Sequence, residues 1–406
     1  MVSFPPFGSA QDKLQRETRL VSTNLWMPAG ACPRLRSGAG MTVLPWDGLV
    51  FFTKFLVTHR KAVLGVVIAI VLGVAYPAAA QRLGKNLEEI AQLASKEKTI
   101  RVANSWEPQN EPVLLKGFYQ KYPGLKVTST RASGIETRER ILNEALAGVV
   151  DFDLVNVSGE LRPNYIKAGV MAGPIEWRKL FPNIKDLHFS PDGYFVVSGF
   201  SKYIIVYNPT LVPKDKVPKK WEDCLDPYWK GKLVVLTRPR TFTGLASGWG
   251  EEKTVKYARA LKDNQPVWKS SQSGALTQVA VGEYPMICGV AYHSTKDLMV
   301  RDPKASIAYS VPSDLPIQIG EAMAIMKGAK SPNAALLLAG WLIAPEAQKI
   351  MHLEGRDSPF VEGTESDQLI KKHGAKPIWE GWNAIEHEAQ MARKITAAWG
   401  FPKAKN

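Results

Sequence analysis

The chain has 406 residues and a formal net charge of +14, from 52 Lys and Arg against 38 Asp and Glu. The lysines are dispersed and no recognised nucleic-acid-reading motif is present, so the positive charge does not indicate a nucleic-acid-binding protein. A charge of this sign favours anionic partners, either an acidic ligand or a membrane surface.

Residues 1–80 have the pattern of an export leader. A basic stretch at residues 59–61 precedes an apolar run at residues 62–76, and small residues end at Ala80, which predicts a secretory signal peptide cleaved after that residue. The apolar run is shorter than the roughly 20 residues that span a bilayer, although an uncleaved signal anchor is the alternative. Met41 is a candidate initiator, because the segment before it is rich in Pro, Gly and Arg without an apolar period.

Cleavage after Ala80 would leave residues 81–406, which is enough chain for two lobes that each bury a core. The leader carries 8 of the 52 basic and 3 of the 38 acidic residues, so the mature chain has 44 minus 35, a net charge of +9. The mature protein is therefore still expected to prefer anionic partners.

Helical and strand patterns alternate after the leader, which is typical of an α/β architecture. A Pro-Gly pair at residues 123–124 separates the second expected helix from the second strand. Helices are expected at 87–93, 111–122 and 136–147, and strands at 99–103, 125–129 and 152–157.

Three of these strands end in short polar loops, at residues 104–106, 132–134 and 158–160. Ligands of open α/β sheets collect at the carboxyl ends of strands, so the three loops are expected to open into one cleft. Free backbone N–H groups before the helix at 136 would hold a carboxylate, phosphate or carbonate oxygen, unless Ser133 is only a helix N-cap. The candidate ligand residues here are Ser105, Trp106, Ser133, Gly134 and Ser158.

The segment 203–236 predicts a strand followed by a surface connection between lobes. Its β-branched and aromatic start favours a strand, and the prolines at 209, 213 and 218 exclude a helix directly after it. Trp221, Leu225 and Trp229 would line one face of a helix, which Pro227 would interrupt, and we assign them to packing.

Two later loops, 240–244 (RTFTG) and 270–274 (SSQSG), are rich in hydroxyl groups that can hydrogen-bond an oxygen-bearing ligand. The same residue types are also ordinary turn formers. Tyr292 and His293 follow a strand-like run at 286–291. The candidate ligand residues in this half are Tyr207, Arg240, Thr241, Thr243, Ser271, Tyr292 and His293.

A second crossover is expected at 306–309 and 312–319, followed by a helix that begins at Pro332. Glu321, at this crossover, is a candidate support for the hinge or a contact for a cationic group of the ligand. Arg356 is a further ligand candidate, with a surface salt bridge as the alternative. The helix is expected to pack through Leu336, Ala339, Gly340 and Ile343, and a C-terminal helical piece through Trp379, Trp382 and Ile385.

Three passages carry a resemblance to a known family: the Tyr-Asn, Leu-Val-Pro and WEDCLDPYWKGK elements within 203–236, FYQKYPGLKV at 118–127, and the run at 320–351. Together they resemble the periplasmic solute-binding proteins of bacterial ABC importers, in the ferric-iron-type branch. The resemblance implies a two-lobed type II periplasmic-binding fold with two crossover strands as hinge. Expected boundaries are 1–80 for the extension and signal peptide, 81–204 and 312–406 for lobe 1, and 205–311 for lobe 2.

The resemblance also implies a monomer without a cofactor or enzymatic activity, which closes on a small ligand and presents it to a permease with its ATPase subunit. Ferric relatives grip iron with two adjacent tyrosines where this chain has Tyr292 and His293. The loops at Trp106 and Ser158 also lack the histidine and carboxylate of that set. Because Fe(III) requires several anionic oxygens, we expect a small polar or organic anion, with ferric iron as the alternative and Tyr292 as its ligand.

Cys224 stands where the family commonly has an apolar residue, so a buried free thiol is expected, although Cys224 and Cys288 could pair in an oxidising periplasm. An enzyme is the opposing hypothesis, but residues 244–248 (GLASG) fail the G-x-S-x-G spacing and H-E-x-x-H, C-x-x-C and P-loop motifs are absent. The mature histidines, 188, 293, 352, 373 and 387, show no metal-ligand spacing. A membrane-anchored sensory or scaffold lobe is a third reading, which requires an uncleaved signal.

Overall fold

The computed structural model describes residues 82–401, apart from the side chains of Glu160, Ile385 and Glu386. The predictions of a leader, its cleavage site and an initiator at Met41 lie outside these residues. Within the described part, no helix combines the length and the apolar character that a membrane span requires.

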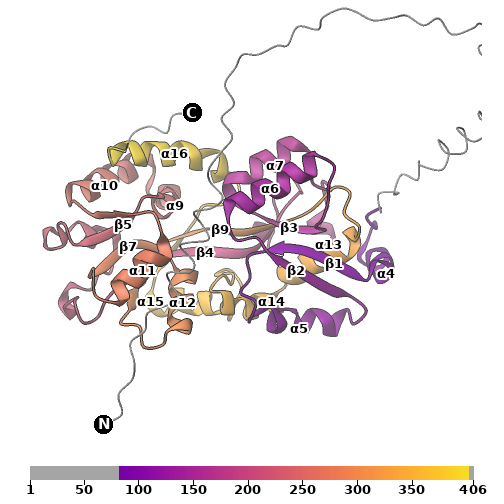
Figure 1. Cartoon of the computed structure of the whole chain (residues 1–406), viewed down its shortest axis with the longest axis horizontal. Helices are drawn as coiled ribbons and strands as arrows, with labels where there is room; N and C mark the ends of the chain where they lie inside the picture. The colour runs from indigo at the N-terminus through magenta and orange to yellow at the C-terminus, as the bar shows by residue number, and fades with distance from the viewer. Residues whose placement is uncertain (1–81, 402–406) are drawn as a thin grey trace, which may run out of the picture. The chain divides into compact units, whose positions relative to one another are not determined.

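The first lobe is built on parallel strands joined by helices (Figure 1). β1 pairs in parallel with β2 on one side and with β3 on the other. Trp106 and Phe118 are among its largest fully buried side chains. Its leading elements are α4 (Leu87–Glu97), β1 (Thr99–Asn104), α5 (Glu111–Lys121), β2 (Lys126–Arg131), α6 (Ile135–Leu146), β3 (Leu154–Val157) and α7 (Arg162–Ala168). They confirm the helix and strand order expected from the sequence.

Two long strands connect the lobes. β4 (Val196–Tyr207) pairs antiparallel with β9 (Asp314–Ile325) as far as Lys202, and from Tyr203 onward it pairs with β7 (Met286–Ala291) instead. With β5 (Leu233–Leu236) and β6 (Val267–Lys269), the resulting strand order is β2-β1-β3-β9-β4-β7-β5-β6. Figure 1 shows β4 and β9 running from one half of the molecule to the other. The two expected crossovers are therefore present, and the change of partner beside Tyr203 lies next to the proposed boundary at 204. Residues 306–309, expected in the second crossover, instead lead into β8 (Ala308–Ser310), which pairs with the end of β4.

The second lobe repeats the α/β pattern around a smaller sheet. β5 pairs in parallel with both β6 and β7, and β8 joins the end of β4. Its elements are β5 (Leu233–Leu236), α9 (Arg240–Trp249), α10 (Glu251–Asp263), β6 (Val267–Lys269), α11 (Gln272–Ala280), β7 (Met286–Ala291), α12 (Tyr292–Arg301) and β8 (Ala308–Ser310).

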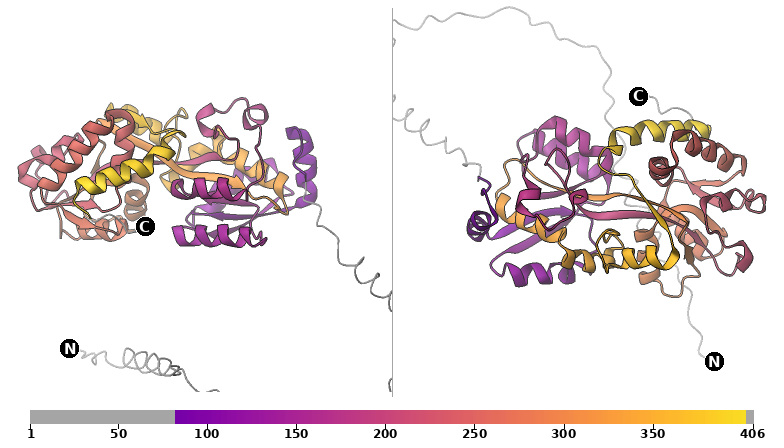
Figure 2. Two further views of the ribbon diagram at one scale, coloured as in Figure 1. Left: turned by 90° about the horizontal axis from the view of Figure 1, so that it is seen from above. Right: turned by 180° about the vertical axis from the view of Figure 1, so that it is seen from behind.

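The return segment begins with α13 (Pro332–Leu342), in which every residue is buried. A Cβ at Gly340 would lie 2.1 Å from the Phe181 ring, so the close approach of helix and ring requires glycine. Residues 376–379, expected to be helical, instead form a strand parallel to β9, because the main-chain groups of that edge are available for pairing. The remaining elements are α14 (Pro345–Ile350), α15 (Glu365–His373), β10 (Lys376–Trp379) and α16 (Ala384–Ala398). Figure 2 shows α16 lying along the second lobe, where it packs on α9 and α10.

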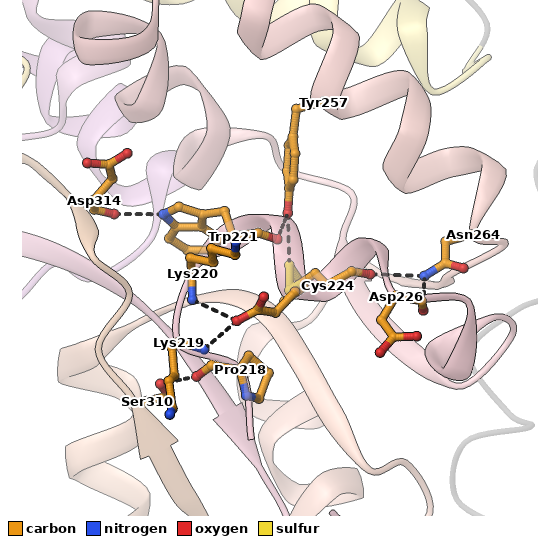
Figure 3. The surroundings of a disulfide bond; sticks show 12 residues. Pro218, Lys219, Lys220, Trp221, Cys224, Asp226, Tyr257, Asn264, Ser310 and Asp314 are labelled. Carbon is orange, nitrogen blue, oxygen red and sulfur yellow. Dashed lines mark hydrogen bonds between the residues drawn. A yellow bond between two sulfur atoms is a disulfide. The ribbon is translucent and has the colours of Figure 1, made fainter. Parts of the chain in front are cut away.

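The tryptophan block forms short 3-10 helices at Trp221–Leu225 and Pro227–Trp229 in place of one α-helix. Trp221 is fully buried, and its indole N–H donates to the carbonyl of Asp314 at 2.7 Å (Figure 3). Tyr257 donates its hydroxyl to the carbonyl of Trp221 at 2.8 Å. These contacts confirm the structural assignment of the aromatic block.

The expectation of a free thiol at Cys224 is wrong, because Cys224 and Cys288 form a disulfide. The bond joins the tryptophan block to β7 and closes a sequence separation of 64 residues. Both cysteines are fully buried, and their Cα atoms lie 6.3 Å apart, within the range that a disulfide spans. The disulfide is thus a covalent link inside the second lobe.

Candidate ligand-binding cleft

A cavity of about 600 Å³ is lined by both lobes and by the crossover strands. The first lobe contributes the loops after β1, β2 and β3, as the sequence predicts for the carboxyl ends of strands. The second lobe contributes the start of α9 and one face of α12, and Ser201, Tyr203 and Gly320 of the crossover strands lie between them. The lining is polar, so the cavity suits a solute with hydrogen-bonding or charged groups.

Seven candidate residues from widely separated parts of the sequence line this cavity. Four come from the first-lobe loops, two from the second lobe and one from the return segment. They are Ser105, Ser133, Gly134, Ser158, Arg240, His293 and Arg356. Whether they contact a ligand stays a prediction, but the structure brings all of them to one place.

The structure places the remaining candidates of the loops elsewhere. Trp106 is only 1% exposed, because it packs in the first-lobe core. Thr241 packs against Gly289, where a Cβ would lie 2.7 Å from its methyl group. Thr243 donates its hydroxyl to the carbonyl of Arg240 at 2.9 Å, inside the first turn of α9. These three side chains hold the fold and do not line the cleft.

Tyr207 and Ser271 also fall outside the lining. Tyr207 ends β4, pairs with Met286 and Ala308, and packs against the second-lobe core. Ser271 is the N-cap of α11, because its hydroxyl accepts a hydrogen bond from the N–H of Gly274 at 3.1 Å. Packing at a strand end and capping of a helix thus account for two hydroxyl-bearing residues that the sequence suggested for binding.

Tyr292 points away from the cleft although its neighbour His293 lines it. The Tyr292 hydroxyl donates to Glu365 of α15 at 2.6 Å. Burial raises the pKa of the Tyr292 phenol, and the Glu365 carboxylate raises it further. Tyr292 and His293 are consecutive residues of α12, so their side chains leave the helix about 100° apart, and only His293 of the two lines the cavity. A phenolate ligand for iron is therefore not provided at this position.

The loop after β2 presents backbone donors to the cavity. Gly134 is the N-cap of α6 in an extended conformation, and no side chain caps the helix. Ser133 is therefore not the N-cap, which removes the alternative role considered for it. The first N–H groups of α6 have no intrahelical partner and, with the helix dipole, favour an anion. A Cβ at Gly134 would lie 2.8 Å from a Glu136 carboxylate oxygen, so glycine lets that side chain fold over the loop.

Charged residues missed by the sequence reasoning make up much of the lining. Lys296 lies three residues after His293 on α12, Arg238 lies two residues before Arg240, and Glu354 lies two before Arg356. Helical spacing from His293 could have found Lys296. In total the lining has six basic residues, Arg131, Arg138, Arg238, Arg240, Lys296 and Arg356, and four acidic ones, Glu107, Glu136, Asp297 and Glu354.

The excess of positive charge comes from the second lobe. Arg238, Arg240 and Lys296 outnumber Asp297 on that wall, whereas the two arginines and two glutamates of the first-lobe loops balance each other. Arg131 already forms an ion pair with Glu107, with one N–O distance of 2.9 Å. Lys296 is paired with Glu365 at 2.6 Å, so an anion held by first-lobe amides would share the second-lobe cations with carboxylates outside the lining.

Arg240 also pairs with α16, beside the first-lobe loop after β3. Its Nε lies 3.5 Å from a carboxylate oxygen of Glu388. Gly159, directly after β3, leaves room for this pair, because a Cβ there would lie 3.5 Å from Glu388 and 3.7 Å from Arg240. The C-terminal helix therefore helps to hold a second-lobe arginine at the edge of the first-lobe wall.

The floor of the cleft contains a buried carboxylate, Glu321, on β9. Its Oε1 accepts a hydrogen bond from the Ser105 hydroxyl and lies 3.6 Å from Arg356 Nε. Nearby, Glu354 Oε1 accepts from Asn110 Nδ2 at 2.8 Å and from the N–H of Glu107 at 3.1 Å. Burial raises the pKa of Glu354 to about 7, and the Glu321 carboxylate adds to the rise.

His293 lies among cations at the other side of the floor. Burial lowers the pKa of its imidazole well below the ordinary value, and the charges of Arg356, Lys202 and Arg240 lower it further. The ring is therefore neutral at neutral pH. Among residues 82–401, no group of three or more His, Cys, Asp or Glu side chains is placed to hold a metal ion.

Comparisons with known proteins agree with this architecture. Residues 151–388, more than half of the chain, match the family of bacterial extracellular solute-binding proteins. An Fe(3+)-binding periplasmic protein from Serratia marcescens is 23% identical over 207 residues, which cover 50% of this chain and 59% of that relative. The match thus spans little more than half of the relative's length.

Solved structures share the fold at low sequence identity. A ferric iron-binding protein A from Mannheimia haemolytica, in an open conformation, superposes with a TM-score of 0.59 at 17% identity, covering 75% of this chain and 98% of that one. A spermidine/putrescine ABC transporter substrate-binding protein from Streptococcus pneumoniae gives 0.54 at 15% identity, covering 74% and 99%. The same two-lobed fold thus occurs in proteins whose names specify very different ligands. This chain belongs to the bacterial extracellular solute-binding protein family.

Proposed function

We propose that this chain is the periplasmic substrate-binding component of an ABC importer and that it captures a small polar anion between its lobes. The observation that carries the proposal is the cleft of about 600 Å³ with six basic against four acidic lining residues. The amides before α6 and the cations of the second lobe would hold the anion from opposite sides. The bound, closed form would then be read by an inner-membrane permease and its ATPase.

Ferric iron is the second candidate, because the Serratia marcescens relative is described as an Fe(3+)-binding periplasmic protein. Against it, Tyr292 is bonded to Glu365 outside the cleft, and its partner position holds a neutral His293. Fe(III) requires several anionic oxygen ligands, which this wall does not supply. A polar anion therefore fits the lining better than the metal.

The deciding experiment is native mass spectrometry of the mature protein purified from its own periplasm, followed by denaturing release and identification of the bound species. A small organic acid or phosphorylated solute supports the anion proposal. One equivalent of iron, with a phenolate-to-iron absorption band and tight Fe(III) binding in the presence of an anion, would contradict it and restore the ferric candidate.

The proposed periplasmic location depends on cleavage of the leader after Ala80. N-terminal sequencing of the exported protein tests this directly. A mature chain that begins at Gln81 supports a soluble periplasmic carrier. Retention of residues 62–76 would support the membrane-anchored sensory or scaffold lobe in its place.

A further inference from the structure

The first-lobe side of the cleft floor holds two carboxylates that share one arginine. Glu321 is completely buried, and its Oε2 has no hydrogen-bond partner among the described residues. Glu354 lines the cavity and is 7% exposed, and within residues 82–401 it accepts hydrogen bonds only from the neutral amides of Asn110 and Glu107. Arg356 is the nearby cation, and its Nε lies 3.6 Å from Glu321.

This arrangement leaves the floor one positive charge short. A buried carboxylate is costly unless it is paired with a cation and its oxygens are hydrogen-bonded. Glu321 and Glu354 together carry two negative charges when ionised, and Arg356 can neutralise one of them. The pKa of Glu354, raised to about 7 by burial and by Glu321, is consistent with a missing counter-ion.

The opposite wall is rich in basic groups. Arg238, Arg240 and Lys296 of the second lobe face the same cavity, and Arg240 and Lys296 pair with Glu388 and Glu365, whose carboxylates do not line it. The groups that line the cleft therefore differ between its two sides, with carboxylates at the floor on the first-lobe side and mainly basic groups on the second-lobe wall. A solute with an anionic group alone would satisfy the basic wall and leave the buried carboxylates without a partner.

We infer that the solute carries a cationic group, such as an ammonium, beside its anionic group, and that Glu354 and Glu321 receive the cation. This inference rests on the proposed function, since it specifies the class of anion that the cleft takes. The cation would donate charge-assisted hydrogen bonds to Glu354 at the cavity surface, while Arg238 and Arg240 hold the anionic group.

Titration calorimetry of the mature protein with two matched pairs of probes tests the inference. O-phosphoethanolamine and ethyl phosphate differ in the ammonium group, as do aspartate and succinate. The ammonium-bearing member of at least one pair is expected to bind about 10-fold more tightly or better, the gain of one charge-assisted hydrogen bond. Glu354→Gln should remove this difference, because its amide keeps the hydrogen bonds from Asn110 and Glu107 but has no charge.

Glu144→Gln is the matched control, since Glu144 pairs with Arg140 on the surface of α6, outside the cleft. It should leave the preference for the ammonium intact, and the ratio between paired probes is a readout that a loss of stability alone would not change. Equal binding within each pair would overturn the inference while the anion proposal stands.

If none of the four probes binds, the co-purified solute decides. A solute with both charges supports the inference, and an acid without a cationic group overturns it. Recovery of iron alone overturns both the inference and the proposed function.

Discussion

Two buried ionic clusters lie on the crossover strands, and their hydrogen bonding differs. Behind the hinge, Lys202 of β4 is fully buried and donates to Asp357 Oδ1 at 3.3 Å, to the Asp357 carbonyl at 3.1 Å and to the Ser366 hydroxyl at 2.6 Å. The second Asp357 oxygen accepts from the N–H of Ser366 at 2.7 Å. In this cluster, one cation meets one carboxylate and each oxygen has a donor.

At the cleft floor, Arg356 pairs with Glu321 and its charge also acts on Glu354, and one Glu321 oxygen has no described partner. Arg356 and Asp357 are adjacent in sequence, so a single turn of chain supplies one member to each cluster. A fully paired buried cluster fixes a structure, whereas an incompletely paired one beside a cavity is available to a ligand. The two clusters contain similar residue types. They differ in whether every buried carboxylate has a cation and every carboxylate oxygen has a hydrogen-bond donor.

Removal of Lys202 should have the largest effect. Lys202→Met leaves Asp357 buried without its cation, so the free energy of unfolding is expected to fall by about 3–5 kcal/mol. Urea denaturation measures the change. A loss as small as that of an exposed ion pair, such as the one removed by Lys371→Met, would mean that the cluster behind the hinge is not a structural element.

Loss of the disulfide should come next. Cys224 and Cys288 close a separation of 64 residues in the second lobe, and their replacement by alanine is expected to cost about 2–4 kcal/mol, mainly through the freer unfolded chain. The midpoint of thermal unfolding, measured for wild-type protein with and without reductant, checks the same link. An unchanged midpoint in both experiments would contradict a stabilising bond.

The order of elements and the strand-end loops could be predicted from the sequence, because periodicity and turn residues act locally. Ser105, Ser133 and Ser158 were placed in one cleft by a general property of parallel sheets. The direction of Tyr292 was not predictable, since it depends on Glu365, which is 73 residues away in the chain. The disulfide was missed for the same reason, because residue type does not report which distant β-strand lies opposite.

The hydrogen-bond partners of hydroxyl side chains were also not predictable from the sequence, even where the partner is only a few residues away. Thr243 and Ser271 satisfy the backbone of their own helices, and Ser158 has no described hydrogen-bond partner although it is only 8% exposed. The sequence patterns around these residues are alike, so the distinction lies in backbone geometry at each helix start.

Tyr292→Phe and Ser133→Ala should separate stability from binding. Tyr292→Phe removes a buried hydrogen bond to Glu365 and is expected to lower the free energy of unfolding by about 1 kcal/mol without changing the affinity for the solute released from the native protein. Ser133→Ala should show the opposite, a few-fold weaker binding at unchanged stability, since Ser133 is exposed at the cleft. Equal effects of both variants on affinity would return Tyr292 to the binding site.

Glu354→Gln should give the smallest change in stability, with a sign opposite to that of Lys202→Met. The pKa of Glu354 is about 7 in the folded protein against 4.5 for an ordinary glutamate. Below that lower value both states are protonated and the two proteins should be equally stable. As the pH rises from 4.5 to 7, the unfolded chain releases a proton that the folded protein retains, so wild-type stability falls relative to the variant.

Above neutral pH, ligand-free Glu354→Gln should therefore be more stable than wild type by about 1 kcal/mol, after allowance for solvent screening. Urea denaturation across this pH range measures the crossover. A variant that is less stable than wild type at alkaline pH would mean that Glu354 has its own cation in the folded protein. The floor of the cleft would then be paired like the cluster behind the hinge, and the distinction between the two regions would be lost.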